Sequence, residues 1–231
     1  MNAVDYKVAI GPWVRYRLEH HRAAWPIPSD DLDIFIVRDF LSKEECASLV
    51  AQIDAGCEPS VVLAPTGDPE YRTSQSCNMN LLDPEIVALD AKLEALLGIA
   101  AAHGEALQGQ RYSVGQQFKP HYDFFYPDQP YWPAMEAGGG QRTWTAMAFL
   151  NQPEAGGETF FPNAGVKVAP RTGNLLVWNN LDAAGAPNEF TLHQGMPVTA
   201  GAKYVITKWH RERPWTSVDV PTYGSGTESG A

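Results

Sequence analysis

The chain has 231 residues, of which 44% are hydrophobic, enough to build one large domain with a core of its own. It carries 17 Lys and Arg against 27 Asp and Glu, and the net charge of -10 would repel both a nucleic-acid backbone and an anionic membrane surface. We therefore expect one soluble domain with neither nucleic acid nor a membrane as its partner, and the sequence does not predict its oligomeric state.

The N-terminus and the cysteines indicate a cytoplasmic location. The first residues contain no apolar segment of a secretory signal, and no stretch approaches the ~20 apolar residues of a membrane-spanning helix. Cys46, Cys57 and Cys77 form an odd set without a CxxC spacing, which indicates neither a disulfide framework nor a thiolate zinc site. Such cysteines suit a reducing compartment.

The chain is predicted to begin with an arm, a strand and a helix. Residues 1–30 mix charged residues with tryptophans and prolines, and we expect a short helix followed by an extended packing arm. The sequence DLDIFIVRDF at 31–40 alternates and is rich in β-prone residues, which predicts a strand. Ser42 and Glu45 then form a capping box, which predicts a helix through about Ile53.

A second helix is predicted from Asp83 and Pro84 to the terminator Gly98. Its apolar side chains fall on one face, and they are Ile86, Leu89, Leu93, Leu96 and Leu97. The first half of the chain is therefore expected to contribute two amphipathic helices.

After residue 106 the chain changes to short β-prone runs separated by Gly, Pro and Asn, for example TWTAMAFLN, NLLVWNN and KYVITKWH. Such spacings favour a sandwich or a double-stranded barrel over βαβ units. We predict a mainly β fold, a double-stranded β-helix (jelly-roll) core, buttressed on one face by the N-terminal helices. The domain is expected to span 31–215. Residues 124–142 are predicted to form a lid or a partly disordered loop, and residues 216–231 a disordered tail.

The segment KPHYDFFYPDQPYW contains a pattern that can bind a metal ion. Residues i and i+2 of a strand point to the same face, so His121 and Asp123 can both face the interior of a barrel. A third ligand must then come from a distant strand. Four histidines lie in charged or loop segments and are set aside: His20, His21, His103 and His210. His193, near the start of a late strand, is the remaining candidate.

Two histidines and one carboxylate leave open positions on an octahedral metal ion, the arrangement of non-haem Fe(II) oxygenases. An anionic cosubstrate beside such a metal needs a nearby cation, and Lys203 follows His193 by ten residues. HxD alone is a weak signal that often arises by chance on a surface or in a core. Combined with a late histidine and lysine in the β-rich half of the chain, it is a much stronger indication of an iron site.

Several ordered motifs in the chain match those of a known family. They are LQGQRYSVGQQFKPHYD, TAMAFLNQPEAGGETFFPNAGVKVAPRTGNLLVWNNL and HQGMPVTAGAKYVITKW. With them the chain resembles the prolyl 4-hydroxylase-like branch of the Fe(II)- and 2-oxoglutarate-dependent dioxygenases, over about residues 35–213. The resemblance implies a hydroxylase that couples decarboxylation of 2-oxoglutarate, to succinate and CO2, with C–H hydroxylation. Its cofactors would be Fe(II), 2-oxoglutarate and O2, with ascorbate as an optional addition.

The resemblance also implies roles for single residues. His121, Asp123 and His193 would bind Fe(II), and Lys203 would pair with the distal carboxylate of 2-oxoglutarate. Further hydrogen bonds to the cosubstrate are implied for Tyr112 and Thr145, and contacts with the substrate or the pocket wall for Arg72, Trp178 and Trp209.

One position departs from the family. Collagen-type members often carry a histidine eight residues after the lysine, near the metal-bound end of the cosubstrate, and this chain has Arg211 there. His210, one position away, would face the other side of a strand. The cosubstrate contact is therefore either made by Arg211 or lost.

Some of these residues also have a structural interpretation. Tyr112, Thr145 and the two tryptophans could fill the core or the barrel wall, and Arg72 could lie on the surface. In the predicted lid, Tyr126 with its aromatic neighbours either grips a substrate or covers the mouth of the barrel.

The leading functional hypothesis is a peptidyl-proline 4-hydroxylase that acts on proline in a flexible segment of another protein, bound along a groove beneath the long loop. A second hypothesis is hydroxylation of a free amino acid or another small molecule. A third, from another class, is a non-catalytic or zinc-bound β-barrel binding protein. The metal triad together with Lys203 argues against the third.

Overall fold

A computed structural model describes residues 3–224, with side chains from residue 6 onward. The helices are α1 (Ala3–Glu19), α2 (Lys43–Gly56), α3 (Pro84–Leu97) and α4 (Trp132–Ala137), with short 3-10 turns at Ala101–His103 and Glu189–Thr191. The strands are β1 (Ala24–Pro26), β2 (Ile34–Val37), β3 (Glu58–Pro59), β4 (Val61–Val62), β5 (Gln75–Asn78), β6 (Gln108–Tyr112), β7 (Phe118–His121), β8 (Arg142–Phe149), β9 (Ala155–Gly156), β10 (Thr159–Phe161), β11 (Val166–Val168), β12 (Leu175–Asn179), β13 (His193–Gly195), β14 (Val198–Ala200), β15 (Lys203–Arg211) and β16 (Tyr223–Gly224). Among these residues, no helix combines the length and apolar character needed to cross a membrane.

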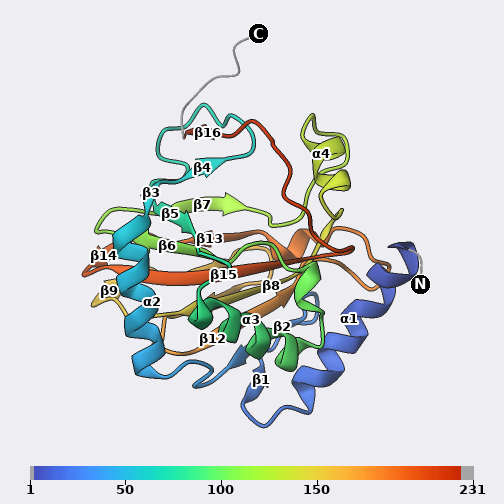
Figure 1. The fold of residues 1–231 in the computed structure, drawn as a ribbon, viewed down its shortest axis with the longest axis horizontal. Helices are drawn as coiled ribbons and strands as arrows, with labels where there is room; N and C mark the ends of the chain where they lie inside the picture. The colour runs from blue at the N-terminus through green and yellow to red at the C-terminus, as the bar shows by residue number, and fades with distance from the viewer. Residues whose placement is uncertain (1–2, 225–231) are drawn as a thin grey trace.

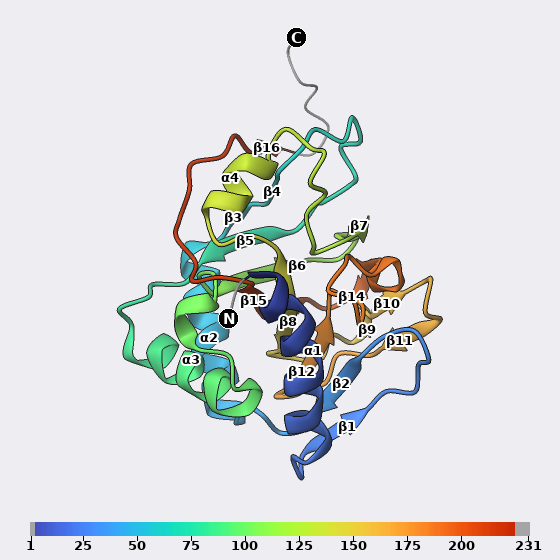
Figure 2. The same cartoon turned by 90° about the vertical axis from the view of Figure 1, so that its right-hand side faces the viewer.

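Two antiparallel sheets form the centre of the molecule (Figure 1). The larger sheet has eight strands in the order β1-β2-β12-β8-β15-β6-β5-β3, and the smaller has four in the order β11-β10-β13-β7. Strands far apart in the sequence are neighbours, since β12 lies between β2 and β8. The predicted mainly β fold is thus confirmed, with α1, α2 and α3 packed against one side of the larger sheet and α4 apart from them (Figure 2).

The larger sheet separates two hydrophobic cores. Alternate residues of a strand face opposite sides, so Tyr204 of β15 joins the core beneath the helices whereas Val205 joins the core between the two sheets. Lys203, the first residue of β15, is buried on the same side of the strand as Val205, between the two sheets. Lys208 lies on the opposite side of the strand, facing the helices, and its Nζ is 2.8 Å from a carboxylate oxygen of Asp90 on α3. The strand register therefore sends one lysine into the barrel and the other toward a helix.

The two helices predicted in the first half begin at the expected residues. The Ser42 hydroxyl accepts a 3.1 Å hydrogen bond from the backbone N–H of Glu45, whose carboxylate accepts a 2.8 Å bond from the Ser42 N–H. Asp83 caps α3 by accepting from the N–H of Glu85 at 2.8 Å, and Gly98 ends the helix with φ 70°. These caps satisfy backbone groups that a helix end otherwise leaves unpaired.

Three segments differ from the sequence-based expectation. The N-terminal arm is a 17-residue helix that includes Pro12, where a short helix was expected. The long segment 124–142 contains the short helix α4. Part of the predicted disordered tail is structured, because residues 223 and 224 form β16 and pair with β4. Residues 225–231 of that predicted tail lie outside the described residues.

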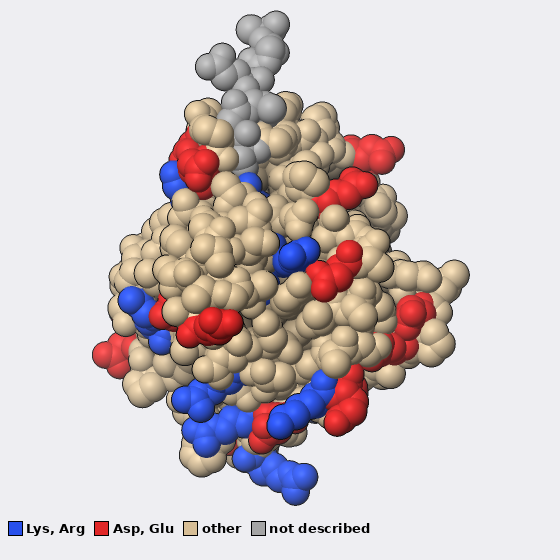
Figure 3. Space-filling model, turned by 90° about the vertical axis from the view of Figure 1, so that its left-hand side faces the viewer, with Lys and Arg blue, Asp and Glu red and all other residues tan. Residues whose placement is uncertain are grey.

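Charged side chains of both signs are interspersed on the face of the molecule shown in Figure 3. Cross-element ion pairs include Lys92 with Glu45, and Arg111 with Asp54 at 3.4 Å. Exposed pairs of this kind contribute little to stability.

Candidate active site

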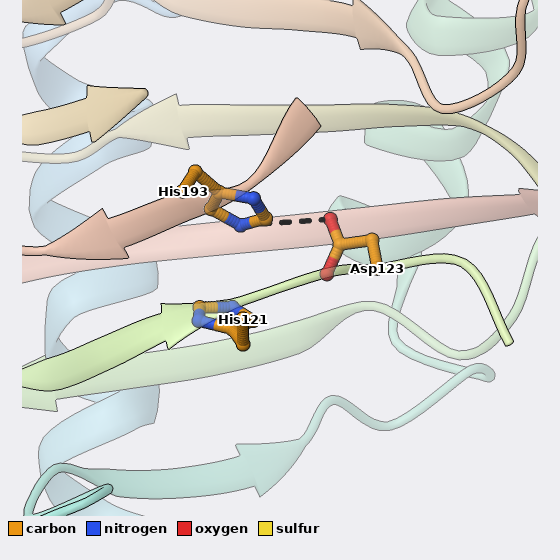
Figure 4. A group of neighbouring side chains, drawn as sticks. All are labelled: His121, Asp123 and His193. Atoms are coloured by element: carbon orange, nitrogen blue, oxygen red, sulfur yellow. Dashed lines mark ion pairs between the residues drawn. The ribbon is translucent and has the colours of Figure 1, made fainter. Parts of the chain in front are cut away.

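The three predicted metal ligands lie together where β7 and β13 of the smaller sheet pair (Figure 4). His121 ends β7 and His193 begins β13, and the two are direct partners in the antiparallel register. Asp123 follows β7 in a bend rather than continuing the strand, which differs from the expected strand geometry. One ligand atom from each residue lies within 4.8 Å of the others, and His193 Nε2 is 3.9 Å from Asp123 Oδ2.

Backbone carbonyls fix the orientation of both imidazoles. Nδ1 of His121 lies 2.8 Å from the Lys119 carbonyl oxygen, and Nδ1 of His193 lies 2.9 Å from that of Thr191. A carbonyl can only accept, so each Nδ1 carries a proton, and in the neutral imidazole the Nε2 atom then presents its lone pair. Burial, and then the neighbouring His193, lower the pKa of His121 well below its ordinary value. His121 is therefore neutral and able to bind a metal.

The carboxylate of Asp123 is held by a buried chain of hydrogen bonds. The Thr145 hydroxyl donates to Asp123 Oδ2 at 2.7 Å, and the Asn180 side-chain amide donates to the Thr145 oxygen at 2.9 Å. In this structure the Thr145 hydroxyl donates its only proton to Asp123. The hydrogen bond from Thr145 to the cosubstrate, which the resemblance implied, is therefore not available in this arrangement. Asn180 was missed at the sequence level, because an asparagine at the end of a strand carries no distinctive signal.

This donor set fits a divalent metal ion. His193 Nε2 and Asp123 Oδ2 lie 3.9 Å apart, which leaves both atoms available as ligands of one cation. Two neutral imidazoles and one carboxylate are the ligands of the facial triad that binds non-haem Fe(II). Because a backbone carbonyl or a threonine orients each ligand, the triad has the supporting contacts typical of a metal centre.

Lys203 lies inside the barrel with the properties of an anion receptor. Its side chain is only 2% exposed, and burial lowers its pKa to about 8, against a small opposing effect of Glu158. Among the described residues its Nζ makes no hydrogen bond or ion pair, and it lies 5.2 Å from the ring centre of Tyr112 and 5.8 Å from that of Phe149. A buried ammonium without a counter-ion fits the carboxylate of a cosubstrate.

Two further buried hydroxyl groups belong to strands of the barrel, on Tyr112 of β6 and Thr159 of β10. Tyr112 is the register partner of Lys203, and its hydroxyl donates to Gln110 Oε1 at 2.7 Å. The buried Thr159 hydroxyl has no hydrogen-bond partner in the described part of the chain. Thr159 was not singled out from the sequence, although its position in the AGGET motif was the available signal. This unpaired buried hydroxyl, on β10 of the smaller sheet, is suited to form a hydrogen bond with a bound ligand.

A cavity of about 670 Å³ opens beside the metal ligands. Arg72, Tyr126 and Trp209 line it together with His121 and Asp123, so three of the predicted substrate residues are brought together. Tyr71, β4 and residues of the C-terminal segment 215–222 form further parts of its wall.

Trp178 does not line this cavity. It packs inside the barrel, with its ring centre 5.0 Å from that of His193 and 5.4 Å from that of Phe161. Its place is behind the metal ligand, which agrees with a wall position rather than with a substrate contact.

Arg211 is anchored in a buried ion network at the edge of the cavity. Its Nε lies 2.6 Å from Glu105 Oε1, and its Nη1 contacts the Gly140 carbonyl. Arg142 forms a two-bond pair with the same Glu105 carboxylate, at 2.6 and 2.7 Å. Burial lowers the pKa of Arg211 to about 10, with Glu105 opposing this shift. Arg211 therefore orders the cavity wall in this structure. Glu105 and Arg142 were missed because their pairing depends on tertiary contacts.

Comparisons with known proteins agree with this site. Residues 107–211 match the model of the 2OG-Fe(II) oxygenase superfamily. The chain is 34% identical over 199 residues to a probable prolyl 4-hydroxylase 6 of Arabidopsis thaliana, covering 76% of this chain and 67% of that protein. It is 36% identical over 152 residues to prolyl 4-hydroxylase subunit alpha-1 of Homo sapiens, covering 64% of this chain but only 28% of the human subunit.

Solved structures share the fold. A viral collagen prolyl hydroxylase from Paramecium Bursaria Chlorella virus-1, solved as a 2OG complex, matches with a TM-score of 0.60 and 27% identity over 76% of this chain and 94% of that one. A prolyl-4-hydroxylase of Pseudomonas putida matches in fold with a TM-score of 0.55 and 20% identity, over 88% and 99% of the two chains. These likenesses confirm the predicted jelly-roll core.

The fold and the site define an Fe(II)- and 2-oxoglutarate-dependent dioxygenase. Within that superfamily, the chain belongs to the prolyl 4-hydroxylase family. The cofactors of the superfamily are Fe(II), 2-oxoglutarate and O2, and the three ligands in the barrel are suited to the metal.

Proposed function

We propose that the protein hydroxylates proline residues in an extended segment of a peptide or protein. The observation that carries the proposal is the cavity of about 670 Å³ that runs from His121 and Asp123 to Arg72 and the C-terminal segment. A cavity of this size exceeds a single proline ring and can hold the flanking residues of an extended chain. The names of the relatives as prolyl 4-hydroxylases support the same substrate class.

In this proposal His121, Asp123 and His193 hold Fe(II), and Lys203 pairs with the distal carboxylate of 2-oxoglutarate, beside the hydroxyls of Tyr112 and Thr159. Bound Fe(II), with 2-oxoglutarate and O2, supplies the oxidising power for C–H hydroxylation and yields succinate and CO2 as co-products. The buried side chains around Lys203 exclude water from the cosubstrate, which strengthens its ion pair with the carboxylate.

The cavity wall has a separate role in positioning the substrate. The Arg72 guanidinium donates to the Val61 carbonyl and to Gln108 Oε1, each at 2.9 Å, and lies 4.6 Å from the ring centre of Phe118. It thereby connects β4 to the strands that carry the site. Tyr126 and Trp209 provide flat apolar surfaces against which a proline ring can pack.

A second candidate is hydroxylation of a free amino acid. Arg72, Arg142 and Arg211 all line the cavity, and guanidinium groups are well suited to bind the carboxylate of such a substrate, although Arg142 and Arg211 already share the carboxylate of Glu105. The two candidates differ in what binds near these arginines, an α-carboxylate or a peptide backbone.

The test is incubation of the purified protein with Fe(II), 2-oxoglutarate, ascorbate and either proline-containing peptides or free L-proline. The proposal predicts the gain of one oxygen on a peptide proline, detected by mass spectrometry and dependent on both Fe(II) and 2-oxoglutarate. Asp123→Ala provides the matched inactive control. Oxygen gain on L-proline alone would favour the second candidate, and release of succinate with neither product would contradict both.

A further inference from the structure

Two cysteines lie in contact at the base of a segment that lines the active-site cavity. Cys57 immediately precedes β3, and Cys77 lies in β5. Their Sγ atoms are 2.8 Å apart, with the Cys57 thiol donating to the Cys77 sulfur, and both residues are partly exposed. A disulfide bond needs about 2.0 Å, so the sulfurs must approach by only roughly 0.8 Å. The third cysteine, Cys46, is buried in the helix-covered core.

Strand pairing brings the two residues together. β3 pairs with β5 in antiparallel register, with Glu58 opposite Ser76 and Pro59 opposite Gln75. Cys57 and Cys77 occupy the next opposed position in that register. Side chains directly opposite each other in an antiparallel pair have neighbouring Cβ atoms, which is the geometry that a cross-strand link requires. The contact therefore follows from the sheet and not from a chance approach of two mobile loops.

The segment enclosed by the pair, residues 58–76, supplies part of the cavity wall. It carries β4 together with Tyr71 and Arg72, all of which line the cavity that contains His121 and Asp123. β4 pairs only with the two-residue strand β16 in its sheet, so few backbone hydrogen bonds secure this part of the segment. A covalent link between Cys57 and Cys77 would close the segment at its base and reduce the conformations open to it.

We propose that Cys57 and Cys77 are a reversible disulfide site whose state controls the mobility of residues 58–76. The oxidant is a low-molecular-weight disulfide such as oxidised glutathione. The Cys77 thiolate attacks one glutathione sulfur and releases the first glutathione thiol. The small fraction of Cys57 that has lost its proton to solvent then attacks the Cys77 sulfur of the mixed disulfide and releases the second glutathione thiol. Two protein thiols are oxidised and one glutathione disulfide is reduced to two thiols.

The hydrogen bond between the sulfurs agrees with these roles. Burial, and then the bond to Cys77, raise the pKa of Cys57 to about 12, so Cys57 keeps its proton in neutral solution. In this hydrogen bond the Cys57 thiol is the donor and the Cys77 sulfur is the acceptor. Cys77 is therefore the attacking residue and Cys57 the resolving one.

The experiment treats the full chain with a graded series of oxidised-to-reduced glutathione ratios, followed by thiol blocking and non-reducing peptide mapping. The proposal predicts a peptide that joins Cys57 to Cys77, lighter by two hydrogens, which dithiothreitol removes. Cys46→Ala serves as the matched control and retains the cross-link, whereas Cys57→Ser and Cys77→Ser each lose it. A stable glutathione adduct on Cys77 in the wild-type protein, or a cross-link between two chains, would overturn the proposal.

Amide hydrogen exchange measures the effect on the segment without any enzyme assay. Oxidation is expected to slow exchange in residues 58–76 at least several-fold in the wild type and to leave it unchanged in Cys57→Ser. Equal exchange in the oxidised and reduced wild type refutes the control of mobility. Any consequence for substrate binding rests on the proposed function, and the peptide hydroxylation assay measures it separately.

Discussion

Replacement of Lys203 by methionine tests whether the barrel holds a receptor for an anion. The ammonium is buried without an ion pair, and its pKa falls from the ordinary 10.5 to about 8 because of burial. At 1.36 kcal/mol per unit, this shift corresponds to a penalty of roughly 3 kcal/mol for keeping the charge inside the folded protein. The Lys203→Met variant, of similar shape and uncharged, is therefore expected to be more stable than the wild type when no cosubstrate is bound.

The pH dependence of this effect has a definite sign. The folded-state pKa of Lys203 is lower than the unfolded value, so between about pH 8 and pH 10.5 the unfolded chain binds more protons. The penalty is fully present below pH 8 and disappears as the pH rises to 10.5. Wild type and Lys203→Met should therefore differ most near pH 7, by up to about 10 °C in Tm, and converge at alkaline pH.

The assay is thermal unfolding under anaerobic conditions, with and without Fe(II) and 2-oxoglutarate. A saturating ligand at 100 times its Kd stabilises the wild type by about 2.7 kcal/mol, whereas Lys203→Met should lose most of this 2-oxoglutarate response. Lys208→Met is the matched control on the same strand. Its lysine is paired with Asp90 at 2.8 Å, so that variant should be less stable than the wild type. Equal Tm values for wild type and Lys203→Met, with equal shifts on adding 2-oxoglutarate, would refute the assignment.

Two further substitutions test the contacts around the site. Thr145→Val removes the hydroxyl that donates to Asp123 Oδ2. In anaerobic calorimetry this variant should bind Fe(II) about 10–100-fold more weakly and still bind 2-oxoglutarate. Unchanged Fe(II) affinity would contradict the role of Thr145. Glu105→Gln leaves the partly buried Arg142 and the buried Arg211 without their shared carboxylate, and it should cost about 3–5 kcal/mol of stability in urea unfolding. A loss below 1 kcal/mol would show that the network does not stabilise the fold.

Local patterns in the sequence predicted much of the fold. The capping box at Ser42, the Asp83–Pro84 start and the Gly98 stop all depend on contacts within a few residues, and the structure has them as predicted. The HxD spacing and the late histidine predicted the three triad residues, and the register partnership of His121 with His193 brings them together, although Asp123 lies in a bend after β7. Lys203 is buried in the barrel, and its role toward 2-oxoglutarate stays a prediction.

The differences come from tertiary contacts that no local pattern records. The hydroxyl of Thr145 is used by Asp123 because β8 passes behind the metal ligand. Arg211 is committed to Glu105, a residue over one hundred positions away in the chain. Residues 223 and 224, with the composition of a flexible tail, become a strand because the edge of β4 accepts their backbone hydrogen bonds.

The central claim is that this barrel binds Fe(II) through His121, Asp123 and His193 and binds 2-oxoglutarate beside it through Lys203. The most direct test is anaerobic titration of the purified protein with Fe(II) and 2-oxoglutarate, observed through the visible metal-to-ligand charge-transfer absorption of the complex. We predict that the absorption appears with the wild type, is lost in His193→Ala and persists in the exposed-residue control His21→Ala. If the wild type binds both ligands without this absorption, or His193→Ala retains it, the proposed metal site is wrong.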